Sequence, residues 1–162
     1  MNVLFGLIGV IPTELGRLVT LQQLCLDRNG LTGSIPKELG SLIKLTRFNL
    51  SGNKLTESIP ADLGRLVRLE VIRLEDNKLT GSIPEALGGL VNLEHLWLSD
   101  NNLAGSIPGE LGDLVKLETL YLENNKLRGA IPAKLGNLDA LSYVQFGNTG
   151  SKSIFRRGNK LS

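Results

Sequence analysis

The sequence predicts an α/β solenoid, in which coils of 24 residues stack into one parallel β-sheet with short helical turns on the opposite side. Three markers recur with this step along the 162 residues. Prolines stand at positions 12, 36, 60, 84, 108 and 132, asparagines at 29, 53, 77, 101 and 125, and Leu-Gly pairs begin at 15, 39, 63, 87, 111 and 135. Because three independent markers keep one period, the chain is an internal repeat, and repeats of this length indicate a solenoid.

The strand of each coil is predicted from the residues just before the repeated asparagine. In LEHLWLSDN the apolar Leu96 and Leu98 alternate with outward positions such as Trp97, which is the period of a strand with one buried face. The same pattern points Leu24 with Leu26, and Leu120 with Leu122, toward the core. One coil cannot bury these leucines alone, so identical coils are expected to stack into a parallel sheet.

The repeated asparagine is expected to leave the strand at a turn and to bind backbone groups of its own and the adjacent coil. These ladder residues are Asn29, Asn53, Asn77, Asn101 and Asn125. The Ile-Pro step then fixes an extended approach to a short helical turn, and we expect the glycine of Leu-Gly to end that turn with positive φ. Glu57 replaces a repeated glycine, so that position either tolerates a side chain or is strained.

The half-repeats LTGSIPKELGSL and LTGSIPEALGGL carry the consensus LxGxIPxxLGxL. They resemble the plant-type leucine-rich repeats, and the resemblance covers nearly the whole chain. It implies a right-handed leucine-rich-repeat solenoid with a concave parallel sheet and helical or 3-10 turns on the convex side. It also implies recognition as the function. Such arrays lie outside the cell in plant receptor-like kinases, and similar ones occur in large multidomain algal and protist proteins.

The departures from the consensus divide the chain into three parts. Residues 1–20 are expected to form a truncated N-terminal repeat with Phe5 in the asparagine slot, and residues 21–140 five full repeats. Residues 141–162 are expected to form a degenerate capping repeat and a basic tail. There Asn148 comes one residue early, Phe155 replaces the proline, and the tail carries Arg156, Arg157 and Lys160. The chain is therefore expected to be a section of a longer protein or a small array with non-standard caps.

Composition limits the class of partner and the compartment. Net charge is +2, which argues against nucleic acid or an acidic membrane surface as the partner. No apolar run approaches the ~20 residues needed to span a bilayer, so no membrane insertion is expected. The opening MNVLFGLIGVI lacks the features of a signal peptide, and a single cysteine, Cys25, excludes a disulfide cap. These absences favour an intracellular location over an extracellular one, and the oligomeric state stays open.

The outward positions of successive strands are free to vary, so a binding surface is expected there. They form columns on the concave face, and the central column reads Cys25, Asn49, Arg73, Trp97, Tyr121 and Gln145. The candidate binding residues are Arg47, Arg73, His95, Trp97, Tyr121 and Tyr143, a composition typical of binding hot spots. Arg73 neighbours Trp97 and is suited to stack on it or to recognise a carboxylate. The alternative is that these aromatic residues only cover exposed sheet.

No catalytic residue, cofactor or metal is expected. His95 is the only histidine and has no cluster of further ligands around it. Asp27, Glu75 and Glu123 occur two coils apart, which is too far for a paired acid and base. No glycine-rich phosphate-binding motif is found, and the neighbours of Cys25 do not activate a thiol.

The sequence therefore predicts a non-catalytic module that recognises a protein or peptide ligand on its concave face, as part of a larger receptor or multidomain protein. Two alternatives remain. The steps Thr32-Gly33-Ser34 and Thr80-Gly81-Ser82 recur at the repeat interval and suit an ice-binding array, although Glu57, Ala104 and Arg128 interrupt it. The array also suits a purely structural role.

Overall fold

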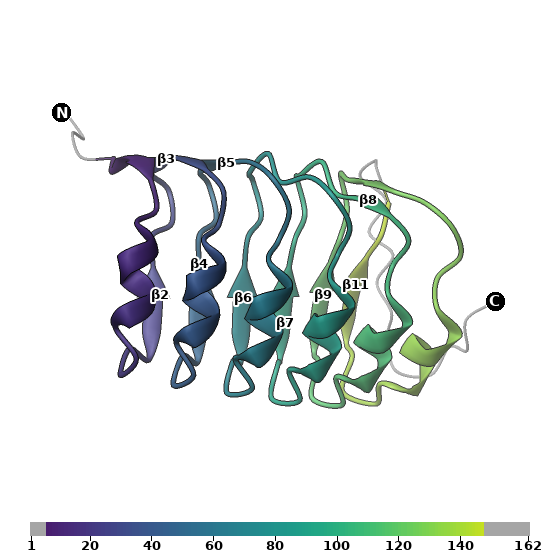
Figure 1. Ribbon diagram of the computed structural model, residues 1–162. Helices are drawn as coiled ribbons and strands as arrows, with labels where there is room; N and C mark the ends of the chain where they lie inside the picture. The colour runs from purple at the N-terminus through teal and green to yellow at the C-terminus, as the bar shows by residue number, and fades with distance from the viewer. Residues whose placement is uncertain (1–5, 148–162) are drawn as a thin grey trace, which may run out of the picture.

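A computed structural model describes residues 6–147 of the protein. Figure 1 shows coils stacked side by side in chain order, each with a strand on one face and a short helical turn on the other. All the strand pairs in this range are parallel. The solenoid predicted from the repeat is confirmed.

The principal sheet has six strands, and its register follows the repeat. Each residue pairs with the residue 24 positions further on, as Phe48 does with Ile72 and Leu96 with Leu120. The predicted columns of outward residues are therefore present. The strands are β2 (Gln23–Cys25), β4 (Arg47–Asn49), β6 (Val71–Arg73), β7 (His95–Trp97), β9 (Thr119–Tyr121) and β11 (Tyr143–Gln145).

The turns opposite the sheet are 3-10 helices, and no α-helix occurs within residues 6–147. A proline precedes each of them with φ between −67° and −59°, the value that its ring fixes, and with ψ between 126° and 135°. These ψ values are those of extended backbone, so the predicted extended approach is confirmed. They are η1 (Thr13–Arg17), η2 (Lys37–Ser41), η3 (Ala61–Arg65), η4 (Glu85–Gly89), η5 (Gly109–Asp113) and η6 (Ala133–Asn137).

The glycine of each Leu-Gly pair has a different role from the predicted one. Among the described residues the glycines with positive φ stand elsewhere, for example Gly33 and Gly81. At Gly40 an added Cβ would lie 2.6 Å from the carbonyl oxygen of Asp62, and at Gly88 it would lie 2.5 Å from that of Glu110. The expectation of positive φ was wrong. Glycine is required because the 3-10 helix of the next coil packs directly against this position.

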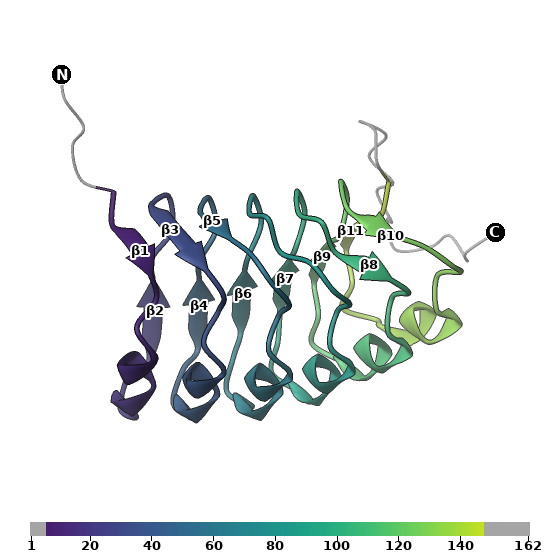
Figure 2. The ribbon, with the colours of Figure 1, turned by 45° about the horizontal axis from the view of Figure 1, so that its top comes forward.

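Shorter strands form a second parallel ladder at one edge of the array, visible in Figure 2. Here the register advances by 22 residues, so Thr32 pairs with Lys54 and Ser58 bridges to Thr80. Threonines 24 residues apart therefore do not face each other across neighbouring strands. The strands are β1 (Ile8–Val10), β3 (Gly30–Gly33) and β5 (Lys54–Leu55) in one sheet, and β8 (Ala104–Gly105) with β10 (Lys126–Leu127) in another.

Glu57 occupies a strained position beside this ladder. Its φ is 63°, in the left-handed region that the equivalent Gly33, Gly81, Gly105 and Gly129 adopt freely. A residue with a Cβ loses about 1–2 kcal/mol in that conformation. Of the two possibilities that the sequence left open, the structure therefore shows strain.

The core is a continuous column of leucines closed by the asparagine ladder. Leu96, Leu98, Leu120 and Leu122 are buried, and Leu24 is buried beside a partly exposed Leu26. Two phenylalanines occupy positions of this same core column, and Phe48 is fully buried whereas Phe146 is only partly so. Burial of one such side chain contributes about 1.5–3 kcal/mol.

Asn77 shows how the ladder joins the coils. Its Nδ2 donates to the carbonyl oxygens of Leu74 and Glu75 in its own coil and of Leu50 in the preceding one. Its Oδ1 accepts the backbone N–H of Leu55 at 3.0 Å. Asn53, Asn101 and Asn125 repeat this pattern. Asn29 donates within its own coil and accepts the backbone N–H of Leu7 from the preceding one.

Several expectations concern residues outside the described range. Phe5, Asn148, Phe155 and the basic Arg156, Arg157 and Lys160 belong to residues 1–5 or 148–162. The start of the expected capping repeat is described, since β11 pairs in register with β9. Within residues 6–147, no helix has the length and apolar character needed to cross a membrane.

Candidate functional site on the concave face

Three side chains of the central column form a continuous stack across β6, β7 and β9. The guanidinium carbon of Arg73 lies 4.3 Å from the ring centroid of Trp97. On the other side of Trp97, Tyr121 stacks with a centroid distance of 5.5 Å and an interplanar angle of 29°. Both distances lie in the range of favourable cation–π and offset-stacked pairs. The register that places these residues opposite each other follows from the 24-residue step.

Thr119 fixes the orientation of two of the predicted site residues. The indole Nε1–H of Trp97 donates to its hydroxyl oxygen at 2.8 Å, and Nδ1 of His95 lies 2.9 Å from the same atom. A hydroxyl accepts one hydrogen bond and donates another, so Thr119 satisfies both rings at once. The side chain is buried, whereas Trp97 and His95 stay partly exposed. The ring of Trp97 is therefore held in place by a side chain of the neighbouring strand.

The carboxylate that Arg73 binds comes from its own coil, two residues after the end of β6. Its Nε donates to Oε1 of Glu75 at 2.9 Å, and a terminal nitrogen contacts the same oxygen at 2.5 Å. The guanidinium therefore both stacks on Trp97 and is neutralised by Glu75. The structure shows the stacking that the sequence indicated, and it gives Arg73 an internal carboxylate partner.

The other two predicted site residues lie apart from the stack. Arg47 is exposed on β4, where its strand neighbours are Gln23 and Val71. Tyr143 is 52% exposed on β11, beside Thr119. Within residues 6–147 neither makes a side-chain hydrogen bond, ion pair or aromatic contact. The structure thus brings together four of the six candidates and leaves two as flanking positions on the same sheet.

Glu123 follows β9 as Glu75 follows β6, and these two glutamates are called the carboxylate border of the stack. Burial raises the pKa of its carboxyl above 4.5, and the negative charge of Asp100 adds to the rise, against hydrogen bonds from its own backbone and from Ser99. The Oε2 atoms of Glu75 and Glu123 are both shielded from solvent and have no hydrogen-bond partner within the described residues. Each of these two carboxylates therefore has an oxygen that can still accept a hydrogen bond.

Sequence reasoning missed Thr119 and the pairing role of Glu75. The signal for Glu75 was present, since it follows Arg73 by two residues and therefore lies on the same face of the sheet. Trp97 pairs directly with Tyr121, and Thr119 stands two positions before Tyr121 on the same strand. Thr119 is therefore the diagonal neighbour of Trp97. Diagonal neighbours lie within reach of an aromatic side chain, but only the rotamer decides that the contact forms.

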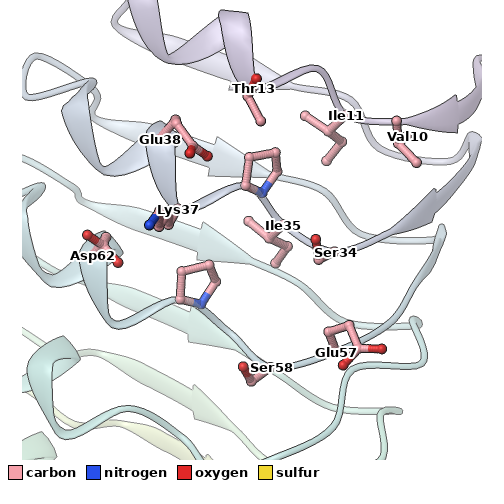
Figure 3. Close-up of a pocket in the computed structure, with 12 residues that line it drawn as sticks. Val10, Ile11, Thr13, Ser34, Ile35, Lys37, Glu38, Glu57, Ser58 and Asp62 are labelled. Atoms are coloured by element: carbon pink, nitrogen blue, oxygen red, sulfur yellow. The ribbon is translucent and has the colours of Figure 1, made fainter.

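A separate hollow lies away from this face, beside the first three 3-10 turns. It has a volume of about 630 Å³ and is open to solvent (Figure 3). Its floor includes Ile11 and Ile35, and its rim includes Lys37, Glu38 and Glu57. It shares no residue with the aromatic stack. No group of three potential metal ligands occurs in the described part of the chain, and Cys25 is exposed as a free thiol.

The arrangement on the concave face can present a rigid, half-buried aromatic surface with charged groups at its border. Such a surface supplies contact area with little loss of side-chain entropy on binding. Its chemistry is that of recognition by stacking, hydrogen bonding and charge.

Comparison with known families identifies the repeat. The family model described as leucine rich repeat matches residues 19–79 and 67–127. The comparison with curated protein sequences gives no match.

Solved structures of plant proteins resemble the array closely. One is the leucine-rich-repeat ectodomain of the membrane receptor kinase GASSHO1/SCHENGEN3 from Arabidopsis thaliana in complex with CASPARIAN STRIP INTEGRITY FACTOR 2, at 44% identity and a TM-score of 0.87 over 88% of this chain and 17% of that one. Another is the plant peptide hormone receptor RGFR1 in complex with RGF2, at 41% identity and a TM-score of 0.86 over 87% and 23%. A plant ice-binding protein is 34% identical with a TM-score of 0.81 over 86% of this chain and 45% of that one. The chain thus spans less than a quarter of the length of either receptor chain.

Proposed function

The chain belongs to the leucine-rich repeat family in its plant-type form, and on that premise we propose that it is a recognition module that binds a protein or peptide on its concave face without catalysis. The observation that carries the proposal is the Arg73–Trp97–Tyr121 stack, anchored from below by Thr119. The core of the coils is formed mainly by leucines and closed by the asparagine ladder, and the three stacked side chains lie outside it.

The geometry of the stack supports a binding role because it is already ordered. Thr119 and the two stacking partners restrain Trp97, so a ligand does not have to immobilise it. Buried aromatic anchors of this kind dominate the energetics of many interfaces. His95 at 6.4 Å from the Trp97 ring adds a hydrogen-bonding edge. Arg47 and Tyr143 are proposed as flanking contacts for a ligand that extends along the sheet.

An extracellular location fits this function better than an intracellular one. The similar structures include the ectodomain of a plant membrane receptor kinase in complex with CASPARIAN STRIP INTEGRITY FACTOR 2 and a plant peptide hormone receptor in complex with RGF2. The intracellular location that the sequence favoured gains no support from them. We infer that the chain acts as the repeat section of a receptor ectodomain.

The test uses binding partners captured from the source tissue, with the affinity of each then measured by biolayer interferometry. Trp97→Ala and Tyr121→Ala are expected to weaken binding at least about tenfold, the loss of a typical hot-spot residue. Val115→Ala is the matched control, because this exposed side chain follows η5 on the opposite side of the coil. Circular dichroism checks that each variant folds.

The same measurement decides between recognition and mere coverage of the sheet. If the aromatic residues only cover exposed strands, Trp97→Ala lowers the stability of the fold, by about 0.2–1 kcal/mol per lost cross-strand pair, and leaves the affinity for every partner unchanged. That outcome also favours a purely structural array.

Ice binding is the second candidate, since a plant ice-binding protein shares the fold and 34% of the sequence. The surface concerned is the second ladder, where Thr32 and Thr80 are exposed. Its register places Lys54 beside Thr32 and Ser58 beside Thr80, which makes a mixed polar row. An ice-recrystallisation assay on the purified chain tests it, with Thr80→Tyr as a variant that disrupts the row. Unhindered crystal growth with the wild type would exclude this function.

A further inference from the structure

The concave face is divided by charge, and the aromatic stack lies in its acidic part. The relevant residues are the three strands that carry the stack, each with its flanking positions: residues 70–76, 94–100 and 118–124. They contain seven carboxylates and one guanidinium, a net charge of −6 with His95 neutral, within a chain whose net charge is +2. The carboxylates are Glu70, Glu75, Asp76, Glu94, Asp100, Glu118 and Glu123.

These carboxylates border the stack at both ends of its strands. Glu70, Glu94 and Glu118 stand one residue before β6, β7 and β9, and each is exposed or half-exposed. The others follow the same strands. Backbone hydrogen bonds from Glu94 to Glu70 and from Glu118 to Glu94 join the first group into a row across the coils that carry the stack. The second group forms a row across the same coils, where backbone hydrogen bonds run from Asp76 to Ser99 and from Asp100 to Glu123.

The cationic groups on this face do not neutralise the border. Arg73 is committed to Glu75 and to the Trp97 ring. Arg47 lies on β4, outside the acidic part. The first two strands with the same flanking positions, residues 22–28 and 46–52, carry Arg28 and Arg47 against Asp27, so the charge of the face changes sign along the array.

The border also has acceptors that no donor in the described residues uses. Oε2 of Glu75 and Oε2 of Glu123 lack hydrogen-bond partners. Rotation about the last side-chain torsion, which is broad for glutamate, turns such an oxygen toward the face. Burial raises the pKa of Glu123, and the negative charge of the nearby Asp100 adds to the rise; a bound cation would relieve the repulsion between these two carboxylates.

We propose that the segment of the ligand lying over the Trp97–Tyr121 stack is cationic: an extended peptide or loop with lysine or arginine side chains that reach the two carboxylate rows. This inference rests on the proposed function and names the ligand class for the same site. Charge complementarity selects this occupant, because an acidic segment would face uncompensated repulsion from both rows. The apolar part of the ligand contacts the aromatic edges, and its charged ends contact the rows.

The experiment selects a displayed library of random 12-residue peptides on the full chain and discards peptides that also bind Trp97→Ala. The remaining peptides are expected to carry net positive charge. One enriched peptide is then synthesised in three forms: as selected, with each Lys and Arg changed to Gln, and with each changed to Glu. Fluorescence anisotropy is expected to show affinity falling at least about tenfold from the first form to the last.

Two triple variants locate the charges. Glu94→Gln with Asp100→Asn and Glu118→Gln removes three carboxylates of the rows and is expected to weaken the cationic peptide about tenfold or more. The control removes three exposed carboxylates from the 3-10 turns on the opposite side and is expected to leave the affinity unchanged; it combines Glu14→Gln, Glu85→Gln and Glu110→Gln.

The outcomes separate this inference from the proposed function. Trp97-dependent peptides that are acidic or neutral, or an affinity unaffected by the row variant, overturn the cationic ligand while the concave binding site stands. Equal effects of the two triple variants also overturn it, because they indicate general attraction to a negative surface. If the library yields no Trp97-dependent peptide of any charge, the concave site itself is refuted.

Discussion

The indole N–H of Trp97 donates to the hydroxyl of Thr119 at 2.8 Å, across neighbouring strands and diagonally within the sheet. This contact consumes the only polar group of the ring and fixes its plane between Arg73 and Tyr121. It is the relationship that converts an exposed tryptophan into an ordered surface.

Thr119→Val is expected to free that ring. Valine keeps the branched shape but leaves the indole N–H and Nδ1 of His95 without their partner. The unfolding free energy is therefore expected to fall by about 1 kcal/mol. This value is near the lower bound for an unsatisfied polar group, because both rings keep access to water. Trp97 is the only tryptophan, so its fluorescence emission reports the change directly. Thr119→Ser keeps the hydroxyl and serves as control. An unchanged emission spectrum in the valine variant would refute the anchoring role.

Glu57→Gly is expected to stabilise the fold by about 0.5–1 kcal/mol. The substitution removes the strain of φ at 63°, and the greater freedom of glycine in the unfolded chain offsets part of the gain. Urea unfolding followed by circular dichroism measures it. Glu57→Ala keeps the strain and separates the backbone effect from the loss of charge; equal stabilities of the glycine and alanine variants would contradict the explanation.

Asn77→Ala is expected to destabilise the array by about 3 kcal/mol or more, because buried backbone groups of two coils lose their partner. The loss acts on the interface between coils, so the unfolding transition should also broaden. Asn92→Ala is the matched control, since within the described residues the side chain of Asn92 makes only exposed hydrogen bonds: Nδ2 donates to the carbonyl of Val67, and Oδ1 accepts from Nζ of Lys116. Similar losses from the two variants would show that the ladder has no special role.

Gly88→Ala and Gly89→Ala test the role of glycine in the 3-10 turns. A Cβ at Gly88 lies 2.5 Å from the carbonyl oxygen of Glu110, whereas at Gly89 the nearest atom within 4 Å is the carbonyl oxygen of Gly64 at 3.7 Å. Gly88→Ala should therefore cost about 1–3 kcal/mol through separation of η4 from η5, and Gly89→Ala should cost little. Thermal unfolding compares them directly. Equal melting temperatures for the two variants would mean that the contact between coils is not tight.

Glu123→Gln is expected to change how stability depends on pH. Burial, with Asp100, raises the pKa of this carboxyl above 4.5, so the folded state binds the proton more tightly than the unfolded state. The stability that protonation supplies is present below pH 4.5 and is lost as the pH rises through the folded pKa. The glutamine variant should therefore be more stable than the wild type at pH 7, with the difference vanishing below pH 4.5. The exposed Glu85→Gln controls for the loss of one charge, and a constant difference at all pH values would contradict the assignment.

The repeat by itself determined the coil. Prolines, asparagines and alternating leucines each act through local geometry or through a contact that recurs identically in every coil, so a period visible in the sequence fixes strand register, ladder and core together. For the same reason the sequence placed Arg73, Trp97 and Tyr121 in one column, and the register confirms it.

Only the tertiary structure decided what depends on distances between coils and on rotamers. The repeat marks Gly40 and Gly88, but it does not reveal that the next 3-10 helix packs closely against them. The 22-residue register that sets Thr32 beside Lys54 and the anchoring of Trp97 by Thr119 leave no periodic trace in the sequence. A pattern states which residues share a face. The approach of neighbouring backbones and the choice of side-chain torsion then determine which of them touch.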